Sequence, residues 1–208
     1  MSKRPFAYLG AAAIVAIVII FIDNPFGNRV DDASFDYFVP GFDVHNIQRF
    51  DVEQMIDGSQ VRRSDDVKWE AAEKTTALKE NLLKNEKRQK PQAAWKEADT
   101  SRVLGALGSF GGLSKGILVS TNPEKRHIYQ VGPTGLHVIA FDKSDEIVLN
   151  VIIGKGGPDF MSTYVRPFDK NEVYLVNRNL TGIFSPRSSD WLKREHIEIK
   201  EALKEESK

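Results

Sequence analysis

Cysteine is absent from this chain of 208 residues. Its absence excludes a disulfide framework, a zinc ribbon, a thiol nucleophile and a lipid anchor on an N-terminal cysteine. An excess of either charge is absent as well, because 29 Lys and Arg balance 29 Asp and Glu. Proteins that bind nucleic acid usually carry a basic excess that neutralises phosphates. We therefore expect no nucleic-acid partner.

Catalytic motifs are also missing. The loop Gly154–Pro158 contains a Gly-Lys pair, but a phosphate-binding loop needs an earlier glycine and a later Ser or Thr where this chain has Leu149 and Gly156. No Gly-x-Ser-x-Gly elbow occurs, and the acidic pairs at 31–32 and 65–66 lack the spacing of a calcium loop. The histidines are scattered: His45, His127, His137 and His196. We predict no catalytic residue, no cofactor and no metal, and hence a protein that is not an enzyme.

A run of 17 uncharged residues, Phe6–Ile22, indicates an N-terminal membrane helix. Such a helix would be about 25 Å long, at the lower limit for crossing a bilayer. Lys3 and Arg4 precede the run and Asp23 follows it, so the positive-inside rule predicts a cytoplasmic N-terminus and an exported body. A cleaved signal peptide is disfavoured because the end of the run lacks a small-x-small site. The residues expected to anchor the helix in lipid are Phe6, Tyr8, Ile14, Ile19, Phe21 and Ile22.

We divide the chain into four parts: the cytoplasmic tip and membrane helix (1–22), a juxtamembrane linker (23–43), an extracytoplasmic domain (44–197) and a charged tail (198–208). The linker combines acidic and turn residues with aromatic side chains. Interleaved aromatics indicate a segment that packs on a surface, either of its own domain or of a partner, and the pattern leaves the two open. The candidate partner contacts in the linker are Phe35, Tyr37, Phe38 and Phe42.

Segments rich in β-branched and aromatic residues predict strands at both ends of the domain. The first group is a β-meander with a hairpin turn at Asp57-Gly58, and the second is a C-terminal antiparallel sheet. The expected strands are 44–53, 60–63, 67–71, 136–141, 146–153, 162–166 and 172–176. Because strands cluster instead of alternating with helices, the predicted class is α+β. Four aromatic residues are expected in the core: Trp69, Tyr164, Tyr174 and Trp191.

The segments between these strands predict helices. One begins at Asp99 or Thr100, a short one follows Asn122-Pro123, and another lies near 180–184. The charged insertion 75–95 carries a helix from Thr75 that Pro91 ends. Its apolar stripe, formed by Leu78, Leu82 and Leu83, is too narrow for a core helix. We predict that this helix projects and contacts a partner or anionic lipid through Lys84, Lys87, Arg88 and Lys90.

Several short strings in the domain carry a family resemblance. They are Lys68-Trp69-Glu70, Ala98–Leu104, Pro123-Glu124, Val151–Lys155, Thr163–Arg166, Glu172–Val176 and Ser189–Lys193. In this order they resemble domain-of-unknown-function family 4340, over roughly Val44–Ile197. The resemblance implies a bacterial protein with one N-terminal membrane anchor, encoded beside ABC-type export or gliding-motility systems. The chain departs from the family pattern in its longer, more charged segment 75–95 and in lacking a second copy of the domain.

These observations lead to one preferred hypothesis and two alternatives. We expect a non-enzymatic accessory subunit in the bacterial inner membrane, with a periplasmic domain that binds other subunits of an ABC-type transport system. The first alternative is a single-span subunit that stabilises a respiratory or photosynthetic complex. The second is an exported hydrolase, which would need paired carboxylates or a nucleophile and base that the sequence does not identify.

Overall fold

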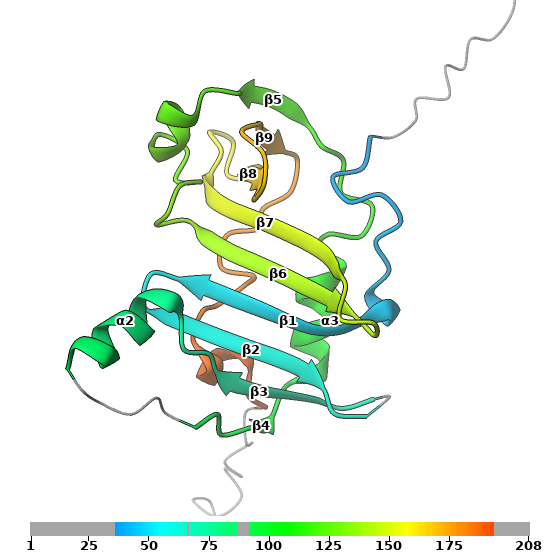
Figure 1. The fold of residues 1–208 in the computed structure, drawn as a ribbon. Helices are drawn as coiled ribbons and strands as arrows, with labels where there is room; N and C mark the ends of the chain where they lie inside the picture. The colour runs from blue at the N-terminus through cyan, green and yellow to red at the C-terminus, as the bar shows by residue number, and fades with distance from the viewer. Residues whose placement is uncertain (1–35, 66, 87–91, 194–208) are drawn as a thin grey trace, which may run out of the picture. The chain divides into compact units, whose positions relative to one another are not determined.

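One antiparallel sheet organises the domain in the computed structural model, which describes residues 36–65, 67–86 and 92–193. The chain divides into two units, 1–36 and 37–208, and the described part belongs almost entirely to the second. Within it the strand order is β4-β3-β2-β1-β6-β7-β8-β9-β5 (Figure 1). The strands are β1 Ile47–Gln54, β2 Asp57–Arg63, β3 Trp69–Glu73, β4 Lys96–Glu97, β5 Ile117–Ser120, β6 Leu136–Asp142, β7 Ile147–Gly156, β8 Thr163–Pro167 and β9 Val173–Val176.

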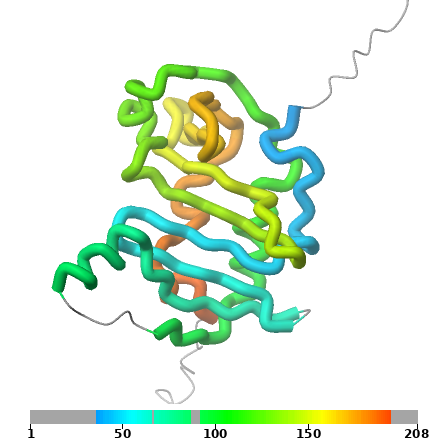
Figure 2. Tube along the Cα trace, in the orientation of Figure 1, coloured from blue at the N-terminus to red at the C-terminus, as the bar shows by residue number. Residues whose placement is uncertain are grey.

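Two α-helices and three short 3-10 turns accompany the sheet in the described residues. The helices are α2 Ala77–Asn85 and α3 Thr100–Gly108, and the turns are η1 Val44–Asn46, η2 Pro123–His127 and η3 Ser188–Trp191. Helix α3 lies behind the sheet in Figure 1. Figure 2 shows the segment after β9 also running down the back of the sheet, to η3 behind β2 and β3. The sheet therefore has one covered face and one face that is largely open.

The core lies on the covered face. Alternate strand residues point into it, among them Phe50 and Val52 of β1 and Val138 and Ala140 of β6, which pair directly across the two strands. Helix α3 adds Val103 and Leu107, and the last segment adds Phe184 and Trp191. The predicted start of α3 is confirmed, since the Asp99 side chain caps the helix by accepting a hydrogen bond from Arg102 N at 3.1 Å.

Trp191 closes the core from behind. Its side chain is 0% exposed and its ring lies 5.1 Å from that of Phe50. The indole Nε1 donates to the Ser185 carbonyl at 2.9 Å and to Ser59 Oγ at 3.0 Å. The last described segment is thus fastened to β2 by both packing and hydrogen bonds. The predicted burial of Trp69 and Trp191 is confirmed.

The α+β class is confirmed, but several local predictions need correction. The meander and the C-terminal strands form one sheet, because β1 pairs with β6. The first hairpin turns at Met55-Ile56, with Asp57 and Gly58 already in β2. Gly58 is required because the backbone that follows β3 passes close to it. A Cβ at this position would lie 2.6 Å from the carbonyl oxygen of Lys74. Residues 180–184 form a turn and not a helix.

Two predicted core tyrosines are only half-buried, and two strands, β4 and β5, lie outside the predicted strands. Tyr164 faces away from the main core and packs on Tyr129, with ring centroids 4.8 Å apart. Tyr174 packs edge-on against Phe38 at the border of the core. Strand β5, which follows a glycine-rich tract, pairs with β9 and ends the sheet. Neither outcome follows from a local pattern, because both depend on what lies across the sheet.

The substitution Trp191→Ala should destabilise the protein by about 3–5 kcal/mol, because it empties a fully buried aromatic site. Urea denaturation of the full chain, followed by circular dichroism, measures the loss. Trp95→Ala is the matched control: Trp95 is half-buried and stacks on Arg62 at 3.8 Å, so its loss should cost about 1 kcal/mol. Equal losses for the two variants would contradict the position assigned to Trp191.

Candidate functional site

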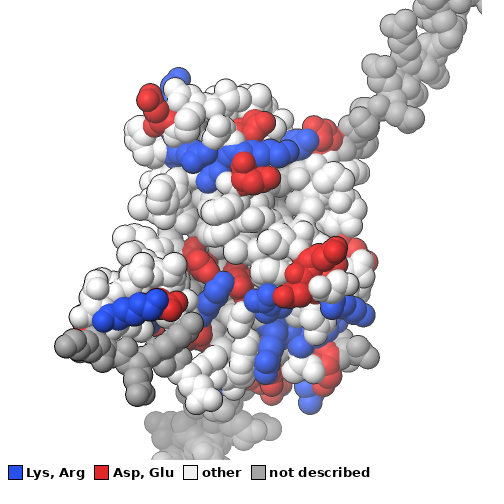
Figure 3. Space-filling view, viewed as in Figure 1, with Lys and Arg blue, Asp and Glu red and all other residues white. Residues whose placement is uncertain are grey.

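The open face of the sheet collects the polar residues of β1 and its neighbours. Since side chains alternate along a strand, Arg49, Asp51 and Glu53 point away from the core that contains Phe50 and Val52. Figure 3 shows charged side chains gathered over β1, β2 and β3 and a second, mainly basic row near β8 and β9. The surface over β6 and β7 lies between them and is largely uncharged.

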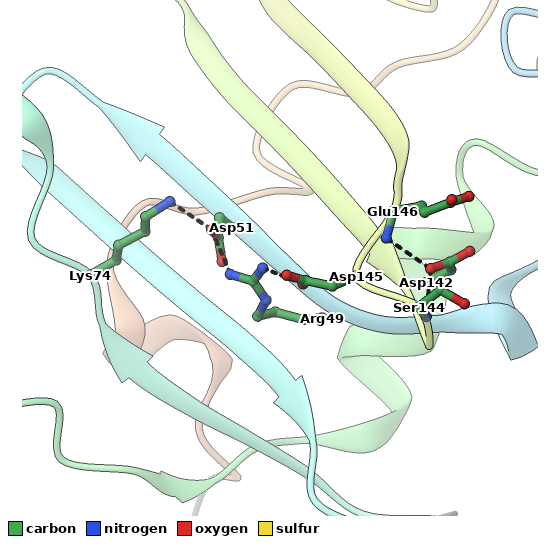
Figure 4. Close-up of polar contacts among 7 residues, drawn as sticks. All are labelled: Arg49, Asp51, Lys74, Asp142, Ser144, Asp145 and Glu146. Carbon is green, nitrogen blue, oxygen red and sulfur yellow. Dashed lines mark hydrogen bonds and ion pairs between the residues drawn. The ribbon is translucent and has the colours of Figure 1, made fainter.

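Asp51 is a carboxylate buried among these charges. It is 1% exposed, and its Oδ2 lies 2.6 Å from Lys74 Nζ and 3.4 Å from Arg49 Nη1 (Figure 4). Its Oδ1 is buried without a hydrogen-bond partner among the described residues. A buried carboxylate is tolerated only when cations compensate its lost hydration, so the two basic side chains are required where they stand.

Lys74 joins this cluster to the next acid along β1. Its ammonium lies 2.6 Å from Asp51 and 2.6 Å from Glu53. Burial by itself lowers the pKa of Lys74, but the hydrogen bonds to Asp51 and Glu53 outweigh it and leave the pKa above its ordinary value. Lys74 therefore stays charged and holds the two carboxylates of β1 on the open face.

Arg49 extends the cluster to the turn between β6 and β7. Its guanidinium lies 3.9 Å above the ring of Phe141 and pairs with Asp145 at 2.8 Å. The turn is shaped by Asp142, whose carboxylate accepts hydrogen bonds from the backbone N–H groups of Ser144 and Glu146 (Figure 4). Arg49 therefore fixes this turn against β1.

A cleft of about 520 Å³ opens next to Glu53, the ion-pair partner of Lys74. A row of directly paired positions crosses four strands beneath it: Glu53 on β1 pairs with His137 on β6, His137 with Ile152 on β7, and Ile152 with Arg166 on β8. All four residues line the cleft. Its walls come from the start of α2 and from the residues that follow η2. This volume is typical of sites for small molecules.

His137 lies in the middle of this row. Its Nε2 is 2.7 Å from Asn150 Oδ1, and its ring stacks on Phe168 with the ring centroids 4.4 Å apart. Burial lowers the pKa of His137 below its ordinary value, and the hydrogen bond to Asn150 opposes this only in part. The imidazole is thus neutral at pH 7, with Nε2 donating to Asn150.

Arg166 provides a buried positive charge at the far end of the row. The residue is 4% exposed and takes part in no ion pair among the described residues. Its Nε donates to the Val131 carbonyl, and its Nη1 to the carbonyls of Pro167, Phe168 and Lys170. Burial, and after it the charge of Arg126, lower the pKa of Arg166, and the charge of Asp169 opposes them only in part. The two guanidinium groups therefore repel one another across the same cleft.

Metal binding has no support in the described part of the chain. Within residues 36–65, 67–86 and 92–193, no three His, Asp or Glu side chains are grouped as metal ligands. The buried Asp51 carboxylate is already compensated by lysine and arginine. The charged side chains of this face can take part in ionic recognition and hydrogen bonding.

The structure answers the open question about the linker for three of its four aromatics. Phe38 is buried beside Tyr174 and belongs to the domain's own core. Phe42 is half-buried and packs against this core, with its ring centroid 6.2 Å from that of Phe110. Burying an apolar ring against the core stabilises the fold compared with leaving the ring exposed to water. Tyr37 is partly exposed and forms a β-bridge with Ser114. Phe35 lies outside the described residues.

The remaining predicted contacts fall on or near α2. Lys84 is exposed and pairs with Glu80 one helical turn earlier at 3.1 Å. Three others lie outside the described residues: Lys87, Arg88 and Lys90. So do the six anchor residues, and no helix in the described part is long and apolar enough to span a membrane.

Fold and site together define an α+β domain with one packed face and one polar, cleft-bearing face. The family described as "Domain of unknown function (DUF4340)" matches residues 89–203, and the chain belongs to that family. The match begins after α2, so it includes His137 and Arg166 but not Asp51 or Lys74. No curated protein and no solved structure matches the chain.

Sequence reasoning missed the cluster and the cleft. A signal for the cluster existed in β1, where charged residues alternate with Phe50 and Val52. In the sequence, His137 is one of four scattered histidines, and Arg166 lies in one of the strings that carry the family resemblance. Their proximity is set by the register between strands that are far apart in the sequence, which no local motif encodes.

Replacing Lys74 by methionine should destabilise the fold by about 3 kcal/mol, because it leaves the buried Asp51 with only the more distant Arg49. Since the pKa of Lys74 is raised, its contribution is present at neutral pH and is lost only as the pH rises through that pKa. Urea denaturation at pH 7 measures the effect. Lys79→Met, which removes a more exposed pair with Glu73, should cost less than about 1 kcal/mol. A Lys74 variant no less stable than this control would show that Asp51 needs no cation there.

Proposed function

We propose that the chain is a non-enzymatic accessory subunit of a larger bacterial membrane assembly, and that this assembly is an ABC-type transport system. An N-terminal helix at residues 6–22 would tether it, with the N-terminus cytoplasmic and the domain in the periplasm. The sequence supports this through the uncharged run that follows Lys3 and Arg4. The family resemblance supports it through the membrane systems beside which such proteins are encoded.

The exposure of α2 is the structural observation that carries the partner-binding part of the proposal. This helix of nine residues buries none of its side chains. So short a helix is marginal in water and usually depends on tertiary packing. Here it is fastened mainly at its first turn, where Thr76 Oγ1 accepts from Lys79 N at 3.2 Å and donates to the Met55 carbonyl at 3.0 Å.

The exposed side of α2 has the character of a contact surface. Leu78 and Leu82 are one helical turn apart and each is 47% exposed. Lys84 lies in the last turn, and the sequence continues into the basic residues up to Lys90. Leucines facing water beside basic residues are typical of a helix that docks in an acidic-rimmed apolar groove. A partner subunit with such a groove would supply the packing that α2 lacks.

The proposal is tested by affinity purification of the tagged full chain from membranes in mild detergent, followed by mass spectrometry. Subunits of a transport ATPase should co-purify with the wild type. The double variant Leu82→Ser, Lys84→Glu should recover them at least about tenfold less well, because it removes an apolar contact and reverses a charge. Ile147→Ser is the control, since Ile147 is 57% exposed on β7 and distant in sequence from α2.

Three outcomes would contradict the proposal. Co-purification of electron-transfer subunits would assign the chain to a respiratory or photosynthetic complex. Equal recovery by the α2 variant and the wild type would remove α2 as the contact. A chain that purifies alone and turns over a model hydrolase substrate would be an enzyme.

A further inference from the structure

We propose that the cleft over β1, β6, β7 and β8 binds a small organic anion, with an oxyanion group held between Arg126 and Arg166 and an apolar body lying along Ile152 and Phe168. The inference does not depend on the membrane tether or on the partner of α2. It rests on the charges, the hydrogen-bonding groups and the walls of the cleft.

The positive charge in the cleft is only partly compensated, because the charge of Asp169 opposes the effects of burial and of Arg126 on the pKa of Arg166 without outweighing them. Arg166 is nearly fully buried, and its Nη2 makes no hydrogen bond among the described residues, although Nε and Nη1 are fully used. Arg126 lines the same cleft, and its Nε is buried without a partner in the described part. Its Nη2 donates to Asn171 Oδ1, a neutral group. Two guanidinium groups that repel one another and form no ion pair with a carboxylate in the described part of the chain can serve as a site for an oxyanion.

Glu53, the acid that lines the cleft, does not neutralise Arg126 and Arg166. Glu53 lies at the opposite end of the paired row, separated from Arg166 by the positions of His137 and Ile152. Its Oε1 is bound to Lys74 at 2.6 Å. The negative charge at one end of the cleft is therefore neutralised by Lys74, while the positive charge at the other end is opposed only in part by Asp169. A cationic ligand would meet this repulsion, whereas an anion would relieve it.

The rest of the lining selects a ligand with an apolar body. Between the two charged ends lie Ile152, the ring of Phe168 stacked on His137, and on the walls Met55 and Leu78. A volume of about 520 Å³ is far larger than a bare phosphate or sulfate ion needs and suits a drug-sized molecule. The arrangement, apolar walls with a few convergent polar groups, is the usual form of a small-molecule site.

Calorimetric titration of the full chain in a neutral detergent tests the proposal with three probes: phenyl phosphate, inorganic phosphate and benzyl alcohol. Phenyl phosphate combines the oxyanion with an apolar ring and should bind saturably. Inorganic phosphate lacks the apolar body and benzyl alcohol lacks the charge, so each should bind at least about tenfold more weakly, given that a charge-assisted hydrogen bond or a buried ring is worth one or more factors of ten.

Matched variants place the binding in this cleft. Arg126→Gln should weaken phenyl phosphate binding by at least about tenfold, whereas Glu53→Gln, which removes the acid of the cleft, should strengthen it. Arg62→Gln is the control, because Arg62 lies on the same face outside the cleft, paired with Glu70. Arg166 is left intact, because its Nη1 holds the turn after β8. Circular dichroism confirms that each variant is folded.

Each probe and each variant has a result that would contradict the proposal. No saturable binding of phenyl phosphate excludes the anion site. Benzyl alcohol binding as tightly as phenyl phosphate would show an apolar cavity without anion recognition. Inorganic phosphate binding equally well would show a free-anion site and exclude the apolar-bodied ligand. Equal losses in the Arg126 and Arg62 variants would place the binding elsewhere.

Discussion

The pairing of β1 with β6 is the constraint on which the rest of the structure depends. It joins the meander β1–β3 to the strands β6–β9 and so makes one sheet from two distant parts of the sequence. Its register places Phe50 opposite Ala140 and Val52 opposite Val138 on the covered face. Helix α3 and the segment ending at Trp191 then pack against a continuous apolar surface, which neither half of the sheet could provide alone.

The same register determines the chemistry of the other face. It sets Glu53 beside His137 and Arg49 beside Phe141, and the pairing continues through β7 to Arg166. A shift by one residue would exchange the charged and apolar sides of β1. The buried Asp51 and its cations resist such a shift, because a displaced carboxylate would face the core uncompensated. Core packing and the ionic cluster therefore specify one arrangement from opposite sides of the sheet.

Local patterns were sufficient for the α+β class, most of the strands and the start of α3 at its Asp99 cap, since each of these depends on neighbours in sequence. They were insufficient for the single sheet, because strand pairing over long separations leaves no local trace. Gly58 shows the same limit: it resembles a turn residue, but its role is to allow the close approach of Lys74. The candidate site does not appear in local patterns for this reason, because its residues come from four strands, β1, β6, β7 and β8, and from two connecting segments.

The most direct test of this account uses the absence of cysteine. In an otherwise unchanged chain, the pair Glu53→Cys and His137→Cys should form an intramolecular disulfide under mild oxidation, because paired residues on one face have Cβ atoms about 4.5–5.5 Å apart. The pair Glu53→Cys and Val138→Cys should not, because those side chains lie on opposite faces. Mass spectrometry of the non-reduced protein shows whether each of the two double variants has formed its disulfide. Closure of the second pair in preference to the first would contradict the register from which the sheet, its core and its cleft are derived.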